Sequence, residues 1–432
     1  MINFENNLAF AQHLDKEDPL KEFKARFNFP TKNNKTLTYF CGNSLGLQPK
    51  SVKGKIDSYL SDWSNLGVEG HVKGQNPWVD FHKKFRRPLA NLVGAEEDEV
   101  IAMNSLTVNL HLMLTTFYRP TNTRFKIITE AQNFSSDLYA LESQVRLHGF
   151  DPNEAIVEVA PRAGSFIISH DDIIKEIEKA GDTLALVLFS GINYYTGQAF
   201  DIKEITNAAH KQGAKAGFDL AHAIGNIKMD LHRWNVDFAV WCSYKYLNSG
   251  PGGTGGLFVH NTYALSKDVP RLAGWFGHKE DERFLMKKGF IPEPGADGWQ
   301  LSNAPVLSLT ALSASLELFE EAGIDNLMRK SARLTSFLEY LITYSCTLKG
   351  NKGDSHYEIK IITPRDNKER GCQLSIHVAN NGKLLYENLI YNGFVVDWRV
   401  PSVLRVAPVP LYNSFEEVYK LAMLLAETCC HG

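Results

Sequence analysis

The stretch WCSYKYLNSGPGGTGGLF, residues 241–258, gives the strongest indication of the architecture of this chain. One lysine, Lys245, stands between two tyrosines, and five glycines follow within the seven positions 250–256. The residues VDFAVWCS at 236–243 have the apolar composition of a buried strand. Lys245 therefore comes directly after the end of a predicted strand, where the chain must turn.

The glycines themselves fit a turn better than a phosphate-binding loop. Gly250, Gly252 and Gly255 match the pattern G-x-G-x-x-G, but a dinucleotide-binding loop must open a helix. Here the glycines lead into GLFVH, which has the composition of a strand. A Walker A loop does not fit either, because Lys245 precedes the glycines. We therefore predict a loop that reverses the chain, with several residues at positive φ.

The residues before this stretch alternate between strand and helix patterns. Strands are predicted at 125–129, 184–190 and 214–222, and a helix at 201–213 begins with capping-box spacing. Strands that alternate with helices form parallel sheets with right-handed crossovers. Ligands bind at the carboxyl ends of such strands, and Lys245 is expected at that edge.

The pattern changes after about residue 322. A long helix at 326–344 leads into short strands, and amphipathic helices follow near 383–392 and 415–428, which predicts a small α+β domain. We expect an N-terminal segment at 1–70 that packs with the small domain, a large domain at 71–325 and the small C-terminal domain at 326–432.

Composition excludes several classes of function. The 432 residues carry 46 basic and 49 acidic side chains, a balance that favours neither a nucleic-acid surface nor a basic membrane-binding patch. The six cysteines form no C-x-x-C pair, so no metal site is predicted. The N-terminus lacks the features of a signal peptide, and no apolar run has the length of a membrane helix. A soluble, cytoplasmic protein is expected.

The residues around Lys245 suit pyridoxal phosphate. A lysine held among aromatic side chains is partly desolvated and is a candidate Schiff-base former, although most lysines are surface residues. Asp219 ends the preceding strand, where its carboxylate could pair with the pyridine nitrogen. Phe134 could stack on the ring, and Ser105 and Thr107 lie at a predicted helix start that favours a phosphate. Each of these residues also has an ordinary structural interpretation, as a cap, a loop or a core side chain.

Motifs along nearly the whole chain resemble the kynureninase family of the aspartate-aminotransferase superfamily, fold type I. The matching segments are YFCGNSLGLQP (39–49), GVEGH (67–71), NSLTVNLHL (104–112), NFSSDLYA (133–140), FDLAHAIGN (218–226), WCSYKYLNSGPGG (241–253), GWFGH (274–278), WQLSN (299–303) and LRVAPVPLYN (404–413). The resemblance implies a large α/β domain with a mainly parallel seven-stranded sheet between helices and a small C-terminal α+β domain.

The same resemblance assigns roles around pyridoxal 5′-phosphate. Lys245 is expected to form the internal aldimine, Asp219 to pair with the pyridine nitrogen, and Tyr244 to assist as an acid. The cofactor-binding positions it implies are Leu106, Thr107, Phe134, Asp137, Ser190, Asp219, His222, Tyr244, Lys245, Trp275 and Asn303. Trp275 and Asn303 are expected to reach the site from the partner subunit of a homodimer.

For the substrate, the resemblance implies that Arg405 binds the α-carboxylate, with Arg399 as the rival candidate. His71 and Asn303 match positions near the aromatic ring of the substrate. The implied reaction is the hydrolysis of L-kynurenine, and of 3-hydroxy-L-kynurenine, to anthranilate or 3-hydroxyanthranilate and L-alanine. This reaction belongs to tryptophan catabolism.

Three alternatives stay open from the sequence. One is another enzyme of the same fold, such as a cysteine desulfurase or selenocysteine lyase, and a second is an aminotransferase. A desulfurase needs a mobile-loop cysteine, and no such loop motif surrounds Cys346 or Cys372. The third is a nucleotide-binding or regulatory module that keeps the fold without catalysis.

Overall fold

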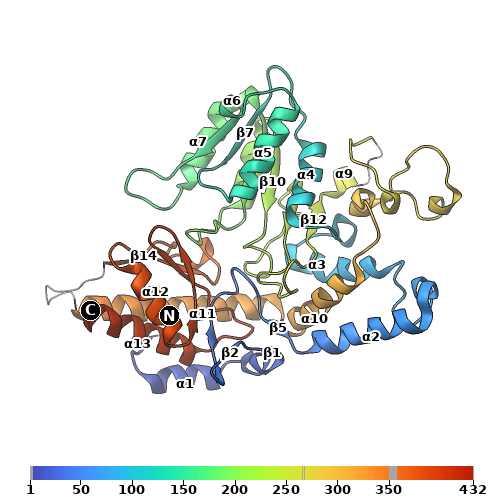
Figure 1. Cartoon of the computed structure of the whole chain (residues 1–432). Helices are drawn as coiled ribbons and strands as arrows, with labels where there is room; N and C mark the ends of the chain where they lie inside the picture. The colour runs from blue at the N-terminus through green and yellow to red at the C-terminus, as the bar shows by residue number, and fades with distance from the viewer. Residues whose placement is uncertain (1–2, 265, 267, 350–357, 432) are drawn as a thin grey trace.

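The chain folds into two lobes, each built around one main sheet (Figure 1). The computed structural model describes residues 3–264, 266, 268–349 and 358–431. The upper lobe in Figure 1 holds a seven-stranded sheet, and the lower lobe holds a four-stranded sheet together with both ends of the chain. We refer to these lobes as the large and the small domain.

The large sheet has the strand order β6-β12-β11-β10-β9-β7-β8. Its strands are β6 (Val100–Ala102), β7 (Lys126–Glu130), β8 (Ile156–Val159), β9 (Leu184–Ser190), β10 (Lys215–Asp219), β11 (Phe238–Trp241) and β12 (Gly256–Val259). β12 runs antiparallel to both of its neighbours, and the other pairings are parallel. The mainly parallel seven-stranded sheet that the resemblance implied is therefore confirmed.

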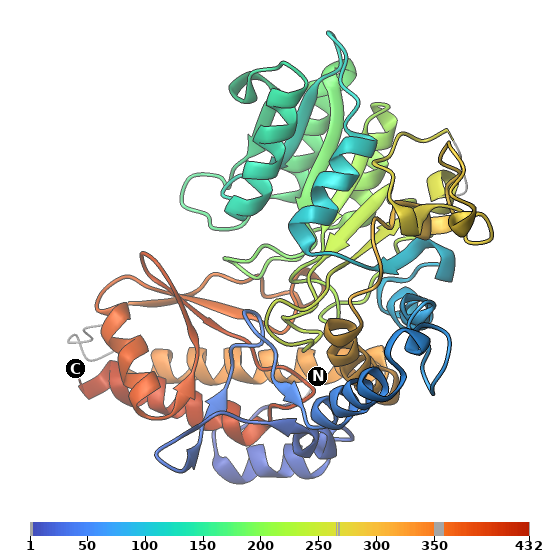
Figure 2. The same ribbon diagram turned by 45° about the vertical axis from the view of Figure 1, so that its right-hand side comes forward.

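Helices cover both faces of this sheet, because its central strands are apolar on both sides. In β9, Leu186 and Leu188 pack against the helices α4 (Leu106–Phe117) and α5 (Ser135–Leu147). The alternating residues Val187 and Phe189 face α7 (His170–Ala180) and α8 (Ile202–Lys211). This alternation follows from the two-residue side-chain period of a strand. Figure 2 shows the cyan helix α4 crossing in front of the strands.

The small domain is an antiparallel sheet covered by helices. Its strand order is β13-β14-β17-β16, with β13 (Ile359–Ile361), β14 (Leu374–Val378), β16 (Asp397–Arg399) and β17 (Val403–Val406). The helices α11 (Ile324–Lys349), α12 (Gly382–Tyr391) and α13 (Phe415–His431) belong to this lobe. The predicted α+β character of the C-terminal part is therefore confirmed.

The N-terminal segment contributes to the small domain. Ala11 and Leu14 of α1 (Leu8–Lys16) share an apolar cluster with residues of α11 and α13. β4 (Thr38–Tyr39) pairs in parallel with β15 (Phe394–Val395). Further along, α2 (Ser51–Leu66) packs on α10 (Val306–Ala322). The domain limits at 70/71 and 325/326 stay predictions.

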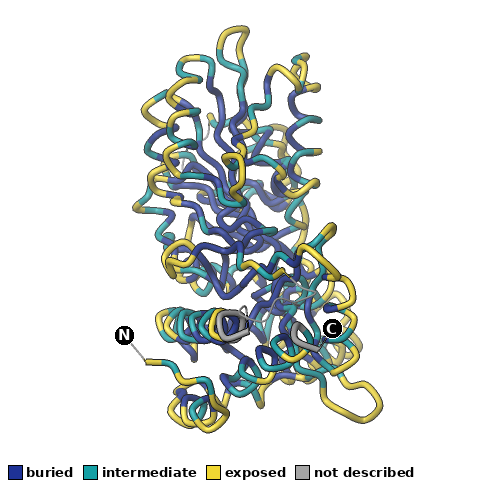
Figure 3. Tube along the Cα trace, turned by 90° about the vertical axis from the view of Figure 1, so that its left-hand side faces the viewer, coloured by how far each residue is buried: buried dark blue, intermediate teal, exposed yellow. Residues whose placement is uncertain are grey.

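The remaining elements are short. They are β1 (Phe27–Asn28), β2 (Thr31–Lys32), β3 (Lys35–Thr36), β5 (Gln48–Pro49), α3 (Arg86–Val93), α6 (Pro152–Ala155), α9 (Asn261–Ala264) and the 3₁₀ turns, among them η2 (Gly67–His71), η4 (Glu97–Glu99), η6 (Trp275–Gly277) and η9 (Asn367–Glu369). Buried residues fill the middle of both lobes, and exposed ones lie on the outer loops (Figure 3). Within the described residues, we find no helix with the length and apolarity to cross a membrane.

Candidate active site

A pocket lies at the carboxyl ends of β9, β10 and β11, where the sequence predicted a ligand. It is lined by Leu106, Thr107, Asn133, Phe134, Ser136, Ser190, Ile192, Tyr194, Asp219, Ala221, His222, Tyr244 and Lys245. The strands end at different positions in the sequence but at one edge in space. Most of the predicted cofactor-binding residues therefore meet here.

The glycine run places Lys245 at this edge. The chain reverses between β11 and β12, with Gly250 at φ +85° and Gly252 at φ +66°, as predicted. A Cβ atom on Gly255 would lie 2.6 Å from the Trp241 carbonyl oxygen and 3.1 Å from the Leu106 nitrogen. Only glycine lets the loop pack this closely against the start of α4.

The amino group of Lys245 lies 2.9 Å from Nε2 of His222. Burial lowers the pKa of His222 well below its usual value, and the nearby charge of Lys245 lowers it further. The imidazole is therefore neutral, and Nε2 accepts the hydrogen bond from the lysine. Nδ1 of His222 is buried and has no hydrogen-bond partner among the described residues.

Three buried carboxyl groups interact with one another at this edge of the sheet: Asp219, Asp137 and Glu130. Asp219 accepts a hydrogen bond of 2.6 Å from the Ala221 amide, and burial raises its pKa. Burial also raises the pKa of Asp137, and the adjacent Asp219 raises it further. Neither carboxyl oxygen of Asp137 has a hydrogen-bond partner within the described part of the chain. Such a cluster favours a cation close by.

Glu130 is the member that the sequence analysis missed. It ends β7, is 1% exposed, and accepts hydrogen bonds from the Ser190 amide at 2.8 Å and from the Ser190 hydroxyl. Burial raises its pKa to about 7. The available signal was an acid directly after the apolar run FKIIT, the same signal that marked Asp219. Tyr194, Asn133 and Ser136 also line the pocket without having been predicted.

An aromatic ring faces the lysine across the pocket. The Lys245 nitrogen lies 5.8 Å from the centre of the Phe134 ring. This ring is 42% exposed, although its edge contact with Tyr194 is close, at 5.4 Å between centres. One face is therefore open to a planar ligand.

These residues fit pyridoxal 5′-phosphate. Lys245 supplies an amine, the buried Asp219 supplies an acceptor for a protonated ring nitrogen, and Phe134 supplies a stacking surface. Ser105 occupies the N-cap of α4 without a side-chain capping bond, so the first-turn N–H groups are open to a phosphate. Thr107 in that turn bonds Ser136 at 2.8 Å.

Comparisons with known proteins identify the family. Residues 327–425 match the Kynureninase C-terminal domain, and residues 38–359 match Aminotransferase class-V. The kynureninase of Flavobacterium psychrophilum is 53% identical over 423 residues, which cover 98% of each chain. The chain belongs to the kynureninase family. Its cofactor is accordingly pyridoxal 5′-phosphate.

More distant relatives agree with this assignment. The kynureninase of Myxococcus xanthus is 49% identical over 98% of this chain and 97% of its own, and that of Nematostella vectensis is 46% identical over 96% and 92%. Among solved structures, the cysteine desulfurase CsdA of Escherichia coli has a TM-score of 0.73 at 17% identity and covers 94% of this chain and 98% of its own. That likeness shows the shared fold alone.

Five residues predicted from the kynureninase resemblance do not line the pocket of the single chain, and one of them is Asp137, which is buried beside Asp219. Trp275 and Asn303 are exposed, and Nε1 of Trp275 donates to the Arg283 carbonyl at 3.2 Å. His71 is exposed at the end of η2, with its ring against Trp78. Arg405 is 1% exposed and reaches the Tyr194 carbonyl oxygen at 2.7 Å, so it borders the pocket without lining it.

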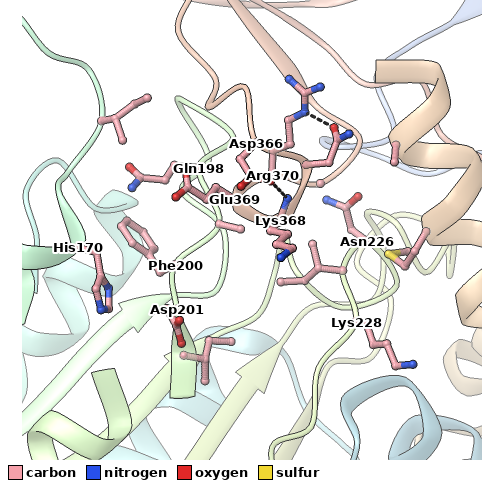
Figure 4. Close-up of a pocket in the computed structure, with 18 of the residues that line it drawn as sticks. His170, Gln198, Phe200, Asp201, Asn226, Lys228, Asp366, Lys368, Glu369 and Arg370 are labelled. Atoms are coloured by element: carbon pink, nitrogen blue, oxygen red, sulfur yellow. Dashed lines mark hydrogen bonds between the residues drawn. The ribbon is translucent and has the colours of Figure 1, made fainter. Parts of the chain in front are cut away.

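A larger cavity of about 850 Å³ lies between the two domains (Figure 4). His170 and Asp201 line it from the large domain, and Lys368 and Arg370 from the small domain. Arg370 is paired with Glu339 at 2.7 Å. We place the chemistry in the smaller pocket, because that pocket combines a lysine with a buried carboxyl group and an open ring face.

A third cluster, at the opposite end of the sheet, could suit a metal by residue type. Glu99, His232 and His260 bring ligand atoms within 4.8 Å of one another. The two imidazole rings lie parallel, at 2°, with centres 5.1 Å apart, so their in-plane lone pairs do not converge. His232 instead pairs with Glu99 at 2.9 Å, which raises the pKa of His232. We interpret this cluster as a structural ion pair.

Proposed function

We propose that this protein hydrolyses L-kynurenine, and also 3-hydroxy-L-kynurenine, to the corresponding anthranilate and L-alanine. The observation that carries the proposal is the meeting of Lys245, Asp219 and Phe134 in one pocket of a chain that is about half identical to kynureninases over 98% of its length. Pyridoxal phosphate, when bound, supplies an electron sink that stabilises negative charge at the substrate carbons beside the amine.

Asp219 would pair with the protonated pyridine nitrogen of the cofactor. Its buried carboxylate is oriented by the Ala221 amide and gains a partner when a protonated ring nitrogen faces it. Burial raises the pKa of Asp219 and the nearby charge of Lys245 lowers it, so a protonated ring nitrogen facing the carboxylate would further favour its charged form.

Lys245 moves the proton at the reacting carbon. With its amino group free, Lys245 would act as the base toward the substrate Cα. The neutral His222 accepts a hydrogen bond from this nitrogen and so fixes its direction. Water then adds to the γ-carbonyl of the substrate, and the Cβ–Cγ bond breaks to release the anthranilate.

Tyr244 is suited to return a proton to the alanine carbon. It is half-buried, and burial raises its pKa, so the hydroxyl keeps its proton at neutral pH. A protonated phenol in the pocket can donate to a carbanion or to a phosphate. Arg405 would bind the α-carboxylate, because a guanidinium matches a carboxylate in a bidentate pair.

We further propose that the active unit is a homodimer. Trp275 and Asn303 are exposed in the single chain and would complete the phosphate site of the partner, as the family resemblance implied. The exposed apolar residues Leu272, Phe284 and Met286 surround Trp275 in sequence and would be covered in such a dimer. His71 as a contact to the substrate ring, and a cytoplasmic location, stay predictions.

Cysteine chemistry finds little support in the described residues. A desulfurase needs a thiol that ionises easily. Cys372 is fully buried, which raises its pKa to about 12, and burial raises the pKa of Cys41 to about 11. Cys346 lies outside the residues whose side chains are described.

The proposal is tested with purified holoenzyme and L-kynurenine. We expect equal amounts of anthranilate and L-alanine, and a visible cofactor absorbance that borohydride removes. Lys245→Ala should lower kcat by ~10²–10⁴-fold, the range for loss of a general base, and borohydride should no longer attach the cofactor covalently to residue 245. Lys368→Ala, which removes an amine from the larger cavity, serves as the matched control. Turnover that survives in Lys245→Ala would contradict the proposal.

A further inference from the structure

The Nε side of the Arg405 guanidinium is hydrogen-bonded to an acidic residue of the neighbouring strand. Asp397 of β16 lies directly opposite Arg405 of β17 in the antiparallel register. Oδ2 of Asp397 accepts a hydrogen bond of 2.6 Å from Nε of Arg405. Because Arg405 is 1% exposed and Asp397 is 17% exposed, this pair is shielded from solvent. It therefore restricts the guanidinium more than a surface ion pair would.

Of the two terminal nitrogens of Arg405, one has a hydrogen-bond partner and the other has none. One terminal nitrogen, NH1, donates to the Tyr194 carbonyl oxygen at 2.7 Å. The second, NH2, is buried and has no hydrogen-bond partner in the part of the chain that the structure covers. A guanidinium has five N–H donors, so the terminal edge keeps free hydrogens while the Nε position is taken. A buried donor without a partner is costly, which indicates a ligand with acceptor oxygens.

The charges of the cluster point to an anionic ligand. Arg399 donates to the same Asp397 oxygen at 2.9 Å, so two guanidinium groups share one carboxylate. Burial raises the pKa of the neighbouring Cys41, and burial lowers that of His222, so both of these are neutral. One positive charge is left without an anion in this cluster.

Tyr194 connects the cluster of Arg405, Asp397 and Arg399 to the pocket. The Tyr194 carbonyl binds Arg405, while the Tyr194 ring lies against Phe134, the ring that faces Lys245. Gln373 of the small domain donates to the same carbonyl at 3.1 Å. The guanidinium is therefore tied to the pocket wall on one side and to Asp397 on the other.

We propose that Asp397 is the positioning residue of substrate recognition: it occupies Nε of Arg405 and thereby presents the terminal N–H pair to the α-carboxylate of the amino acid. This inference rests on the proposed function, in which an amino acid reacts at Lys245. In this arrangement the substrate carboxylate binds the two terminal nitrogens of Arg405, NH1 and NH2. Arg399 is then a second cation paired with Asp397 and does not bind the carboxylate.

The test compares two small ligands of the holoenzyme, L-alanine and ethylamine, which differ by the carboxylate. Their dissociation constants are measured from the change in cofactor absorbance, and the ratio of Kd for ethylamine to Kd for L-alanine reports carboxylate recognition. Asp397→Asn should weaken L-alanine binding by ~10–100-fold, as for a lost hydrogen bond to a charged group, and leave ethylamine binding nearly unchanged. KM for L-kynurenine should rise more than kcat falls.

Asp18→Asn is the matched control, because Asp18 is another buried acid, 2.7 Å from Lys330, and lies outside the pocket. Asp18→Asn should lower the stability of the protein without changing the ratio of the two dissociation constants.

Asp397→Glu, which keeps the charge but displaces it, is the second variant in case the Asp397→Asn protein does not fold, and it should also lower this ratio. The inference is overturned if neither variant lowers the ratio, or if Asp18→Asn lowers it equally. Failure of the wild-type enzyme to cleave L-kynurenine would refute the proposed function alone, since the ligand ratio is measured without turnover.

Discussion

Two buried aspartates at opposite ends of the large sheet have opposite surroundings. Asp237 directly precedes β11 and is 1% exposed, and its oxygens accept from His210 at 2.7 Å, the Ala216 amide at 2.7 Å and Tyr263 at 2.6 Å. Despite its burial, the pKa of Asp237 is lowered, because these donors and Lys215 stabilise the charge. At the other end, burial raises the pKa of Asp219, and Asp137 beside it is unpartnered within the described residues.

This difference separates an end of the sheet that stabilises the fold from an end that performs chemistry. A fully bonded buried carboxylate contributes to stability and has no capacity left for a ligand. A buried carboxylate without partners weakens the folded protein until a cation binds it. The Glu99–His232 pair lies at the same end as Asp237 and is bonded in the same way.

Between these two aspartates, the largest expected effect is on activity, from Asp219→Ala. Removal of this carboxylate should lower kcat by ~10²–10³-fold, the usual cost of losing one electrostatic stabiliser. The free energy of unfolding of the apoprotein should change little, because the loss of the hydrogen bond from the Ala221 amide is offset by the removal of a carboxyl group that burial disfavours in its charged form. Steady-state kinetics and urea unfolding measure the two quantities. A large loss of stability with a normal kcat would contradict the assignment of Asp219 to catalysis.

Asp237→Ala should show the opposite pattern. We expect the free energy of unfolding to fall by ~2–4 kcal/mol, since the Ala216 amide and the Tyr263 hydroxyl lose their acceptor. His210 and Lys215 are partly exposed and can turn to solvent, which limits the loss. The kcat of the folded fraction should stay near the wild-type value. If this variant lost activity but not stability, the assignment of Asp237 to fold stability would be wrong.

A smaller effect concerns pH and Glu130→Gln. The folded-state pKa of Glu130 is about 7, above the ordinary 4.5, so the folded apoprotein binds more protons than the unfolded chain between these values. The free energy of unfolding therefore falls as pH rises from about 4.5 to 7, by up to roughly 3 kcal/mol from this group. Glutamine does not titrate, so the variant should show a flatter dependence. Equal slopes in urea unfolding of both apoproteins, at pH 5 and pH 7, would contradict this.

The sequence predicted much of the large domain because its signals are local. The strand expected at 184–190 is β9 to the residue, and Asp201 caps α8 by accepting from the Glu204 amide at 3.0 Å. Lys245, Asp219 and Phe134 were found because each follows a strand or opens a helix at one sheet edge. Position along a strand is enough to place such residues.

Residues whose role depends on distant contacts could not be found in this way. Asp397 follows an ordinary apolar run, and only the register of β16 with β17 sets it opposite Arg405. Residues 394–399 form two strands, because β15 pairs with β4 of the N-terminal segment while β16 stays in the small sheet. Glu130 carried a usable signal, but its bond to Ser190 joins two strands that lie apart in the sequence.

The pairing of β4 with β15 has a consequence for how the chain is made. Thr38 and Phe394 are partners, about 350 residues apart, and ribosomes add ~5–20 residues per second. After its synthesis, β4 therefore waits roughly 20–70 s before its neighbour β15 has been made. Until then the N-terminal segment must avoid wrong partners, and a nascent chain cut before residue 394 leaves that strand edge uncovered.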